Sequence, residues 1–299
     1  MRKKTLGIIL AGGKSSRLYP ATLVATKQIL PIYDKPLIYY SLSTLMLAGI
    51  REFVIISNPN EKHVFQELFK DCEKSMGIKI HFAVQDKPRG IADAFNIVGN
   101  ISHKHLDLDS FDRIALILGD NIFYGAALSV LLDMSVNEEK AVIYATRVHD
   151  PERFGVVEVG ENDIALSLEE KPKKPKSNLA VTGLYIYPPD VFGRAYRLRP
   201  SDRGELEITD LNKLYMNDNN LRVVKLLRGM IWFDTGTPDS MMEASQYVQT
   251  IQKQQDTLIG SPHEVAYNNK WIDNESLHRT HRMCSKTDYG QYLLSLMET

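Results

Sequence analysis

Short apolar runs alternate with amphipathic segments through the first half of the chain. The runs have the length of strands, and the segments between them carry apolar residues at helical spacing. The predicted strands cover residues 6–10, 53–56, 80–84, 114–118 and 141–148. The predicted helices between them cover residues 37–48, 61–70 and 92–98. Because strand–helix–strand units form parallel pairs, this order predicts an open, largely parallel sheet with helices on both faces.

The pattern changes after residue 150. Residues 156–159 and 165–169 read as an antiparallel pair that turns at Asn162-Asp163, and residues 181–187 read as a further strand. We therefore expect a smaller β-rich lobe built on the same sheet.

The last part of the chain has a helical pattern. It begins at Pro238, and no strand pattern follows it. The sequence thus predicts an α/β domain with two lobes over residues 1–240 and a helical region over residues 241–299.

Composition and charge are those of an ordinary globular protein. Of the 299 residues, 43% are hydrophobic and 24% are charged, which suits one large domain or two close lobes. The net charge of −1 gives no general attraction to nucleic acids or membranes. Cys72 and Cys284 show no metal or redox spacing, and the first apolar run is too short for a signal peptide or a membrane span. We expect a reducing compartment, the cytoplasm.

A glycine-rich loop directly follows the first predicted strand. Residues 11–17 read AGGKSSR, and a second cationic stretch, TKQ, follows at residues 26–28. A glycine loop at the carboxyl edge of a sheet exposes backbone N–H groups that bind phosphate. Arg17 and Lys27 would add two positive charges to that anion. The sequence therefore predicts a site that holds a polyphosphate.

Other interpretations of this loop fit less well. A dinucleotide-binding loop needs G-x-G-x-x-G, and the second half is missing. A P-loop needs four residues between its glycines, whereas Gly7 and Gly13 have five between them. A tight strand-to-helix turn would explain the glycines but would leave Arg17 and Lys27 unexplained.

Two aspartates follow apolar strands. Asp120 lies in Gly119-Asp120-Asn121, and Asp234 lies in WFDTGT at residues 232–237. Such carboxylates could share one Mg²⁺, whose preferred ligands are oxygens and phosphates. Either aspartate could instead cap a helix, Asp234 the one expected from Pro238.

Two further segments carry polar groups suited to a phosphorylated sugar. At Glu170-Lys171, the ammonium would take the phosphate and the carboxylate the hydroxyls, although a surface ion pair is the simpler interpretation. Residues 203–209, RGELEIT, are expected to begin a helix. The eight histidines show no ligand spacing, so none is assigned to a metal.

Taken together, these segments resemble the glucose-1-phosphate thymidylyltransferases of the sugar nucleotidyltransferase family. The resemblance covers nearly the whole chain, and its order and spacing are specific. It is carried by GIILAGG (7–13), TKQILPIYDKP (26–36), LGDNIFYG (118–125), DPERFGVVE (150–158), LEEKP (168–172), AVTGLY (180–185), RGELEITD (203–210), DTGT (234–237) and YGQYL (289–293).

The resemblance implies a fold and a reaction. The fold is a Rossmann-like mixed, mainly parallel sheet flanked by helices, with a β-rich sugar-binding lobe and C-terminal helices at a subunit interface. The reaction joins dTTP and α-D-glucose 1-phosphate into dTDP-glucose and pyrophosphate, the first step of dTDP-deoxysugar biosynthesis for polysaccharides. The family also implies Mg²⁺ and a homotetramer.

The resemblance further implies roles for individual residues. Arg17, Lys27, Asp120 and Asp234 would be catalytic, with Asp120 and Asp234 as metal ligands. The nucleotide-binding positions correspond to Leu10, Gly12, Gly13, Ser15, Ser16, Arg17, Gln28, Gln85, Gly90 and Asp120. The sugar-phosphate positions correspond to Lys27, Asn121, Phe154, Gly155, Glu170, Lys171, Val181, Arg203, Thr209 and Trp232.

The chain departs from the family pattern at several places, two of which belong to the expected nucleotide site. Ser15 stands where the usual GGSGTR loop has glycine, which predicts an unusual backbone conformation there. In the base-recognition stretch the usual QPSPDGLAQ is QDKPRGIAD, so Arg89 and Asp93 change the local charge. Use of UTP or of another hexose 1-phosphate therefore stays an alternative. A P-loop-like NTP hydrolase and a non-catalytic sugar-nucleotide sensor are the other function classes.

Overall fold

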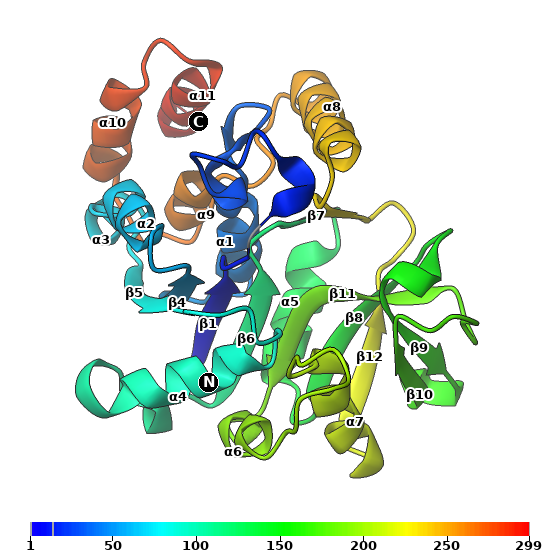
Figure 1. Ribbon diagram of the computed structural model, residues 1–299. Coiled ribbons are helices and arrows are strands. Elements are labelled where there is room, and N and C mark those ends of the chain that lie inside the picture. The colour runs from blue at the N-terminus through cyan, green and yellow to red at the C-terminus, as the bar shows by residue number, and fades with distance from the viewer. Residues whose placement is uncertain (1, 14, 299) are drawn as a thin grey trace.

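The computed structural model describes residues 2–13 and 15–298. Its centre is a nine-stranded sheet with the order β10-β9-β11-β6-β1-β4-β5, in which β8 also pairs with β11 and β12 pairs with β8 (Figure 1). Four neighbouring strands are parallel: β6 (Arg113–Leu118), β1 (Thr5–Leu10), β4 (Glu52–Ser57) and β5 (Lys79–Val84). The apolar runs of the first half of the sequence form these strands, as predicted.

The other half of the sheet is organised around β11 (Leu179–Tyr187). This strand runs antiparallel to β6, to β8 (Ala141–Arg147) and to β9 (Gly155–Val159). β9 pairs antiparallel with β10 (Ala165–Glu170), and β12 (Leu221–Lys225) pairs parallel with β8. The predicted mixed sheet with a β-rich lobe attached to it is therefore confirmed.

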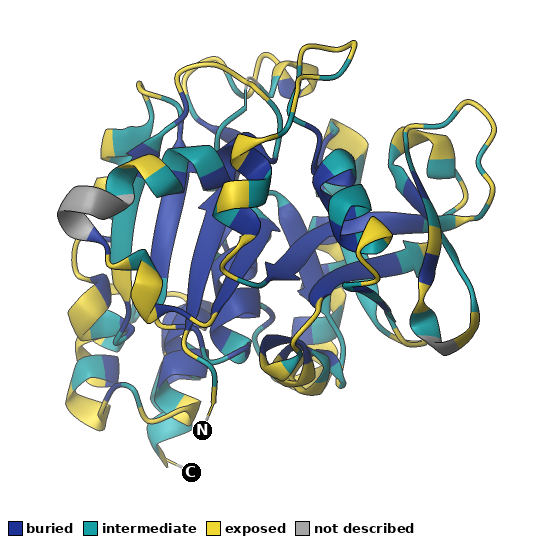
Figure 2. Cartoon of the chain, turned by 90° about the horizontal axis from the view of Figure 1, so that it is seen from below, coloured by how far each residue is buried: buried dark blue, intermediate teal, exposed yellow. Residues whose placement is uncertain are grey.

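Alternation along the central strands sends side chains to opposite faces of the sheet. In β1, Leu6 and Ile8 are fully buried in one core cluster, and Ile9 is fully buried in the other. The first cluster is covered by α4 (Asp93–His105), α6 (Val191–Tyr196) and α7 (Ile208–Asn217). Figure 2 shows the strands as the buried centre and the exposed residues on the outer helices and loops.

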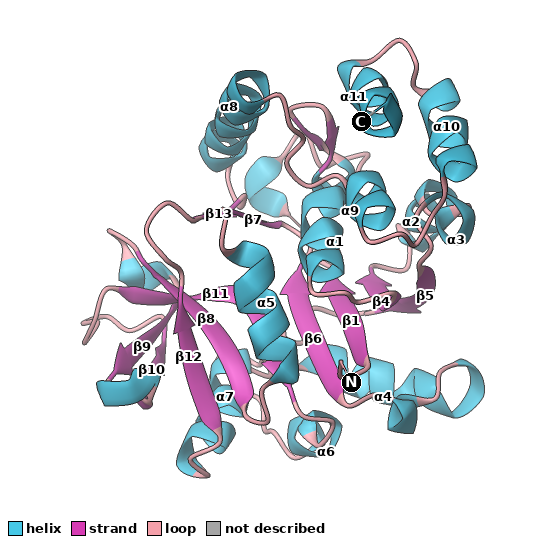
Figure 3. Ribbon diagram, turned by 180° about the vertical axis from the view of Figure 1, so that it is seen from behind, coloured by secondary structure: helices cyan, strands magenta, loops and turns pink. Residues whose placement is uncertain are grey.

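The second face is covered by α1 (Leu37–Leu47), α5 (Leu128–Asn137) and α9 (Pro262–Asn268), of which α1 and α5 lie over the sheet in Figure 3. The short helices α2 (Lys62–Leu68) and α3 (Cys72–Ser75) lie between β4 and β5 in the chain. The C-terminal part adds α8 (Pro238–Gln255), α10 (Asn274–Met283) and α11 (Asp288–Glu298). Among the described residues, no helix is both long enough and apolar enough to span a membrane.

Several short strands lie outside the main sheet, and the sequence indicated only the apolar strand that leads to Asp234. β7 (Asn121–Tyr124) and β13 (Ile231–Asp234) form a separate antiparallel pair, and β2 (Pro31–Ile32) pairs with β3 (Lys35–Pro36). The prediction that residues 203–209 begin a helix was wrong for most of that segment, because α7 starts only at Ile208. The short strands that were not predicted have too few residues to show an alternating pattern. In residues 203–207, Arg203 forms an ion pair with Glu207, and the helix begins only after this pair.

Candidate active site

The candidate site lies where the parallel strands end. The carboxyl ends of β1, β4 and β6 meet there: the amide of Ala11 donates to the carbonyl of Ile56 at 2.7 Å, and the amide of Gly119 donates to that of Leu10 at 2.9 Å. Loops that follow these strands therefore emerge side by side, as is usual for binding sites on parallel sheets. Leu10, predicted at the nucleotide, is the buried last residue of β1.

The glycine-rich loop takes a turn that excludes a P-loop. In a P-loop the glycines lead straight into an α-helix, whereas here Ser16–Leu18 form a single 3₁₀ turn. Ser15 has φ 43° and ψ 34°, a left-handed conformation that favours glycine, so the unusual backbone predicted at this substitution is confirmed. Lys14 lies outside the described residues.

Asn58 supports the loop from the next strand, a role that the sequence did not reveal. It follows β4, and its Nδ2 donates to the carbonyl of Gly13 at 3.3 Å. A β-carbon added to Gly12 would lie 3.4 Å from Oε1 of Gln85, so the residue that follows β5 also contributes a side chain here. A polar residue directly after a buried strand was the signal that could have pointed to Asn58.

The four charged residues predicted to be catalytic come together beside this loop. Nζ of Lys27, which is only 6% exposed, forms an ion pair with the carboxylate of Asp120. Asp234 lies opposite Asn121 in the β7–β13 pair, next to Asp120. Arg17 and Asp234 meet at Gly236. A β-carbon on Gly236 would lie 3.1 Å from a guanidinium nitrogen of Arg17 and 3.5 Å from Oδ1 of Asp234.

Electrostatics link these residues. Burial raises the pKa of Asp234 above its usual value, and the negative charge of Asp120 raises it further. Lys27 and Arg17 act in the opposite direction on that pKa. Two carboxylates that disfavour each other's charge, faced by two cations, form a centre that gains from additional positive charge.

The structure contradicts the helix-cap interpretation of both aspartates. Asp120 is followed by a strand, β7, and not by a helix. The cap of α8 is Thr237, whose hydroxyl accepts a hydrogen bond from the amide of Ser240 at 3.2 Å. Neither carboxylate is therefore required for a helix end.

Asn121 fixes the position of Asp120. It is 1% exposed, and its Nδ2 donates to Oδ1 of Asp120 at 2.8 Å. Its own Oδ1 accepts from the indole N–H of Trp232 at 2.6 Å and from the amide of Gly183 at 3.1 Å. Asn121 thus joins β7, β11 and β13 behind the carboxylate.

The residues predicted for the sugar phosphate gather on β9, β10 and α7. The hydroxyl of Thr209 donates to Oε2 of Glu170 at 2.5 Å, and a β-carbon on Gly155 would lie 3.1 Å from that hydroxyl and 3.8 Å from Val181. Lys171 is half exposed, with its Nζ 3.9 Å from Oε1 of Glu170.

Aromatic and charged side chains extend this group. The rings of Phe154 and Trp232 meet edge to face with centroids 5.2 Å apart, which links the group to Asn121. Arg203 contacts Glu207 at 2.8 Å and Glu170 at 3.4 Å. Most of the charge of Arg203 is therefore engaged by carboxylates of its own chain.

The predicted base-recognition residues lie at the end of β5. Gln85 is 7% exposed, and its Nε2 donates to Oδ2 of Asp93 at 3.1 Å. Gly90 has φ +100° and lies so close to the backbone of Leu206 that a side chain there would clash. Gln28 is also buried, with its Oε1 accepting from the hydroxyl of Thr26 at 2.7 Å.

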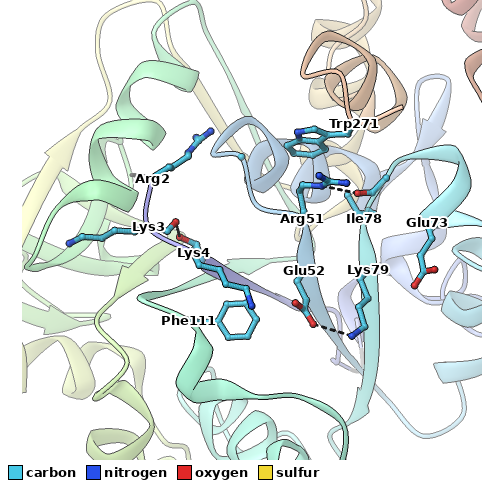
Figure 4. A pocket seen from close by; sticks show the side chains of 13 residues that line it. Arg2, Lys3, Lys4, Arg51, Glu52, Glu73, Ile78, Lys79, Phe111 and Trp271 are labelled. Carbon is cyan, nitrogen blue, oxygen red and sulfur yellow. Dashed lines mark hydrogen bonds and ion pairs between the residues drawn. The ribbon is translucent and has the colours of Figure 1, made fainter. Parts of the chain in front are cut away.

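A second cationic cavity, of about 660 Å³, lies at the amino ends of β1, β4 and β5 (Figure 4). Its cations are Arg2, Lys3, Lys4, Arg51 and Lys79. Arg2, Lys3 and Lys79 form ion pairs with carboxylates of this chain. Lys4 lies over the ring of Phe111, and Arg51 lies over Trp271. Because these charges already have partners, the cavity is a weaker anion site than the carboxyl edge of the sheet.

Asp120 and Asp234 have the chemistry of a magnesium site. Mg²⁺ is usually held by one or two carboxylates together with substrate phosphates. Among residues 2–13 and 15–298, no group of three or more His, Cys, Asp or Glu side chains could hold a metal ion. A metal at the two aspartates would therefore complete its ligands with phosphate oxygens or water.

Comparison with known proteins agrees with this geometry. A family-wide sequence profile described as nucleotidyl transferase matches residues 6–251. Glucose-1-phosphate thymidylyltransferases from Neisseria meningitidis and from Mycobacterium tuberculosis are each 47% identical to the chain, over 98% of its length and 99% of theirs. The chain belongs to the nucleotidyl transferase family, in its glucose-1-phosphate thymidylyltransferase branch.

Solved structures extend the family likeness to the fold. A structure of a candidate glucose-1-phosphate thymidylyltransferase from Bacillus anthracis has a TM-score of 0.73 and 35% identity, covering 87% of this chain and 99% of its own. A UDP-glucose pyrophosphorylase has a TM-score of 0.68 at 22% identity, covering 83% of this nucleotidyl transferase and 99% of its own chain, and shows the fold alone.

Proposed function

We propose that the chain transfers a thymidylyl group from dTTP to α-D-glucose 1-phosphate, giving dTDP-glucose and pyrophosphate. The observation that carries the proposal is the convergence of Arg17, Lys27, Asp120 and Asp234 beside the glycine loop. Relatives with 47% identity over nearly the full length carry the name of this activity. A sensor would not need two cations and two carboxylates at one point, and the 3₁₀ turn after the glycine loop is unlike that of a P-loop hydrolase.

The central problem of the reaction is repulsion between two anions. An oxygen of the sugar phosphate must approach the α-phosphorus of a triphosphate that is itself negative. Phosphoryl-type transfer depends mainly on positioning and on electrostatic stabilisation. The protein therefore has to neutralise both substrates and hold them in line.

Each cation has a proposed role. Lys27, held at Asp120, would bind the attacking phosphate or the oxygens of the α-phosphate. Arg17 would stabilise the pyrophosphate that leaves. No general base is required, because the attacking phosphate is already ionised at neutral pH. When bound by Asp120 and Asp234, Mg²⁺ supplies further positive charge to the phosphates.

The remaining site residues would bind the two substrates. For the nucleotide we propose three groups of residues. They are the loop residues Gly12, Gly13, Ser15 and Ser16, the buried residues Leu10 and Gln28, and the base-recognition residues Gln85 and Gly90. For the sugar phosphate we propose Asn121, Phe154, Gly155, Glu170, Lys171, Val181, Arg203, Thr209 and Trp232. Their contacts with one another, described above, support two adjoining subsites.

The test is a substrate panel. Four nucleoside triphosphates are combined with several hexose 1-phosphates, and pyrophosphate release is measured with and without Mg²⁺. We expect turnover to require Mg²⁺ and to be fastest with dTTP and glucose 1-phosphate. Preference for UTP or another hexose would redirect the substrate assignment, and nucleotide turnover without any sugar phosphate would contradict a transferase.

We also propose a cytoplasmic homotetramer whose subunit interface includes the helical region over residues 241–299. Both cysteines, Cys72 and Cys284, are free thiols, which suits a reducing compartment. Light scattering of the purified protein tests the assembly; a monomer with full activity would contradict it.

A further inference from the structure

The amide of Gln85 has one orientation in this chain, and Asp93 sets it. Both residues are 7% exposed, and Nε2 of Gln85 donates to Oδ2 of Asp93 at 3.1 Å. The same nitrogen lies 3.5 Å from the carbonyl of Gly90. Both neighbours of this nitrogen are acceptors.

A carboxylate allows only one choice of amide orientation. A glutamine amide has a donor end and an acceptor end of nearly equal shape, so its direction depends on its partners. An ionised carboxylate accepts and never donates, and Asp93 is the first residue of α4, where the helix dipole favours negative charge. Nε2 must therefore face Asp93, which leaves Oε1 of Gln85 free to face elsewhere.

The free oxygen faces the nucleotide loop. Oε1 of Gln85 is the atom closest to the point that a β-carbon on Gly12 would occupy, at 3.4 Å. On that side Gln85 therefore offers an acceptor and no donor.

We infer that Asp93 is a positioning residue for base selection, because it holds Gln85 as an acceptor toward the N3 position of the base. The inference rests on the proposed function, which puts the base at Gln85. Thymine and uracil carry an N–H at N3, which this oxygen can accept. Cytosine carries a lone pair there, which would face another lone pair without a hydrogen bond.

An amide in place of the Asp93 carboxylate could either donate or accept, so it would not fix the direction of Gln85 by itself. The carboxylate of Asp93 thus adds discrimination against cytosine, and none between dTTP and UTP.

The test compares kcat/KM for dTTP and for dCTP in matched variants. Asp93→Asn keeps the shape but allows Gln85 to turn, and we expect the dTTP-to-dCTP ratio to fall roughly 10- to 100-fold, mainly through a lower KM for dCTP. Asp93→Glu retains a carboxylate and should keep more of the ratio than Asp93→Asn. Asp86→Asn removes the same charge from an exposed position of the same loop and should leave the ratio unchanged.

A reciprocal exchange of the two side chains distinguishes the loss of orientation from a general loss of folding or activity. In Gln85→Glu/Asp93→Asn the donor and acceptor of the pair are swapped, and an acceptor again faces the base. We expect this double variant to regain discrimination that Asp93→Asn has lost. An unchanged ratio in folded Asp93→Asn with full dTTP turnover overturns the inference alone, whereas wild-type protein without dTTP turnover overturns the proposed function.

Discussion

At the scale of single residues, Lys27 is buried enough to act strongly on phosphate, whereas Arg17 is exposed. Lys27 is 6% exposed and its charge is balanced by Asp120, so little solvent screens it. We expect Lys27→Ala to lower kcat by roughly 10²–10³, like the loss of one transition-state donor. Pyrophosphate release at saturating substrates measures this, with Lys70→Ala, an exposed lysine paired with Glu67, as the control. Near-normal turnover in a folded variant would refute the role of Lys27.

Ser15 offers a separate test, of backbone conformation. A side chain at φ 43° costs roughly 1–2 kcal/mol, of which glycine would recover part after its larger entropy loss on folding. We therefore expect Ser15→Gly to raise the free energy of unfolding by about 0.5–1 kcal/mol, measured by urea denaturation. Ser16→Gly, in the adjoining 3₁₀ turn, should lower it. Equal effects of both variants would contradict the interpretation.

At the scale of elements, the short β7–β13 pair places both aspartates. Asp120 precedes β7, Asp234 ends β13, and Trp232 on β13 donates to Asn121 behind Asp120. Trp232→Phe removes one donor and keeps an aromatic ring beside Phe154. We expect kcat to fall about fivefold and the free energy of unfolding to fall by about 1 kcal/mol. Trp271→Phe, at the opposite end of the sheet over Arg51, should leave kcat unchanged.

The elements also show how far the sequence could lead. The strands with continuous apolar runs, such as β1 and β6, were predicted within a residue or two, and so was α8. Asp120 and Asp234 were predicted as site residues because they follow apolar runs, although Asp234 is itself the last residue of β13. β7 was missed because four residues are too few to show alternation, whereas β13 was indicated by the apolar residues before Asp234.

Contacts between segments that are distant in the chain could not be predicted from the sequence. The bond from Gln85 to Asp93, the pairing of Arg203 with Glu170, and the support of Gly13 by Asn58 depend on how strands and loops meet in space. Residues 203–207 looked like a helix start because charges and small polar groups favour one. Their charges are instead held by neighbouring carboxylates, and the helix begins after them.

At the scale of the whole molecule, the site costs stability. Because burial and Asp120 raise the pKa of Asp234, its ionised form is disfavoured in the folded state. The penalty is absent below the ordinary pKa of 3.8, grows as the pH rises through the folded-state pKa, and is complete above it. We expect Asp234→Asn to raise the melting temperature of the metal-free enzyme by roughly 2 °C at pH 7 while abolishing turnover.

The matched variant for this prediction is Asp120→Asn. It should also abolish turnover but should lower the melting temperature, because Lys27 would be left buried with a neutral partner. Thermal scans in a chelating buffer measure both. A decrease for Asp234→Asn as large as that for Asp120→Asn would contradict the cost assigned to the paired carboxylates.

The C-terminal helices introduce a second pH dependence, which runs in the opposite direction although burial causes it too. His263 on α9 is buried, its Nδ1 lies 2.8 Å from the hydroxyl of Tyr289 on α11, and burial lowers its pKa from 6.5 to about 4. Below pH 6.5 the unfolded chain binds a proton that the folded chain refuses, so stability falls as the pH falls toward 4. Between pH 7 and pH 5 the free energy of unfolding falls by about 2 kcal/mol from this cause.

His263→Gln should remove this contribution to the pH dependence of the free energy of unfolding, measured with urea at the two pH values. His278→Gln, at an exposed position of α10, should retain it. Because the comparison uses the slope, a uniform loss of stability in His263→Gln does not affect it, and equal slopes in all three proteins would show that His263 does not couple the packing of α9 and α11 to protons.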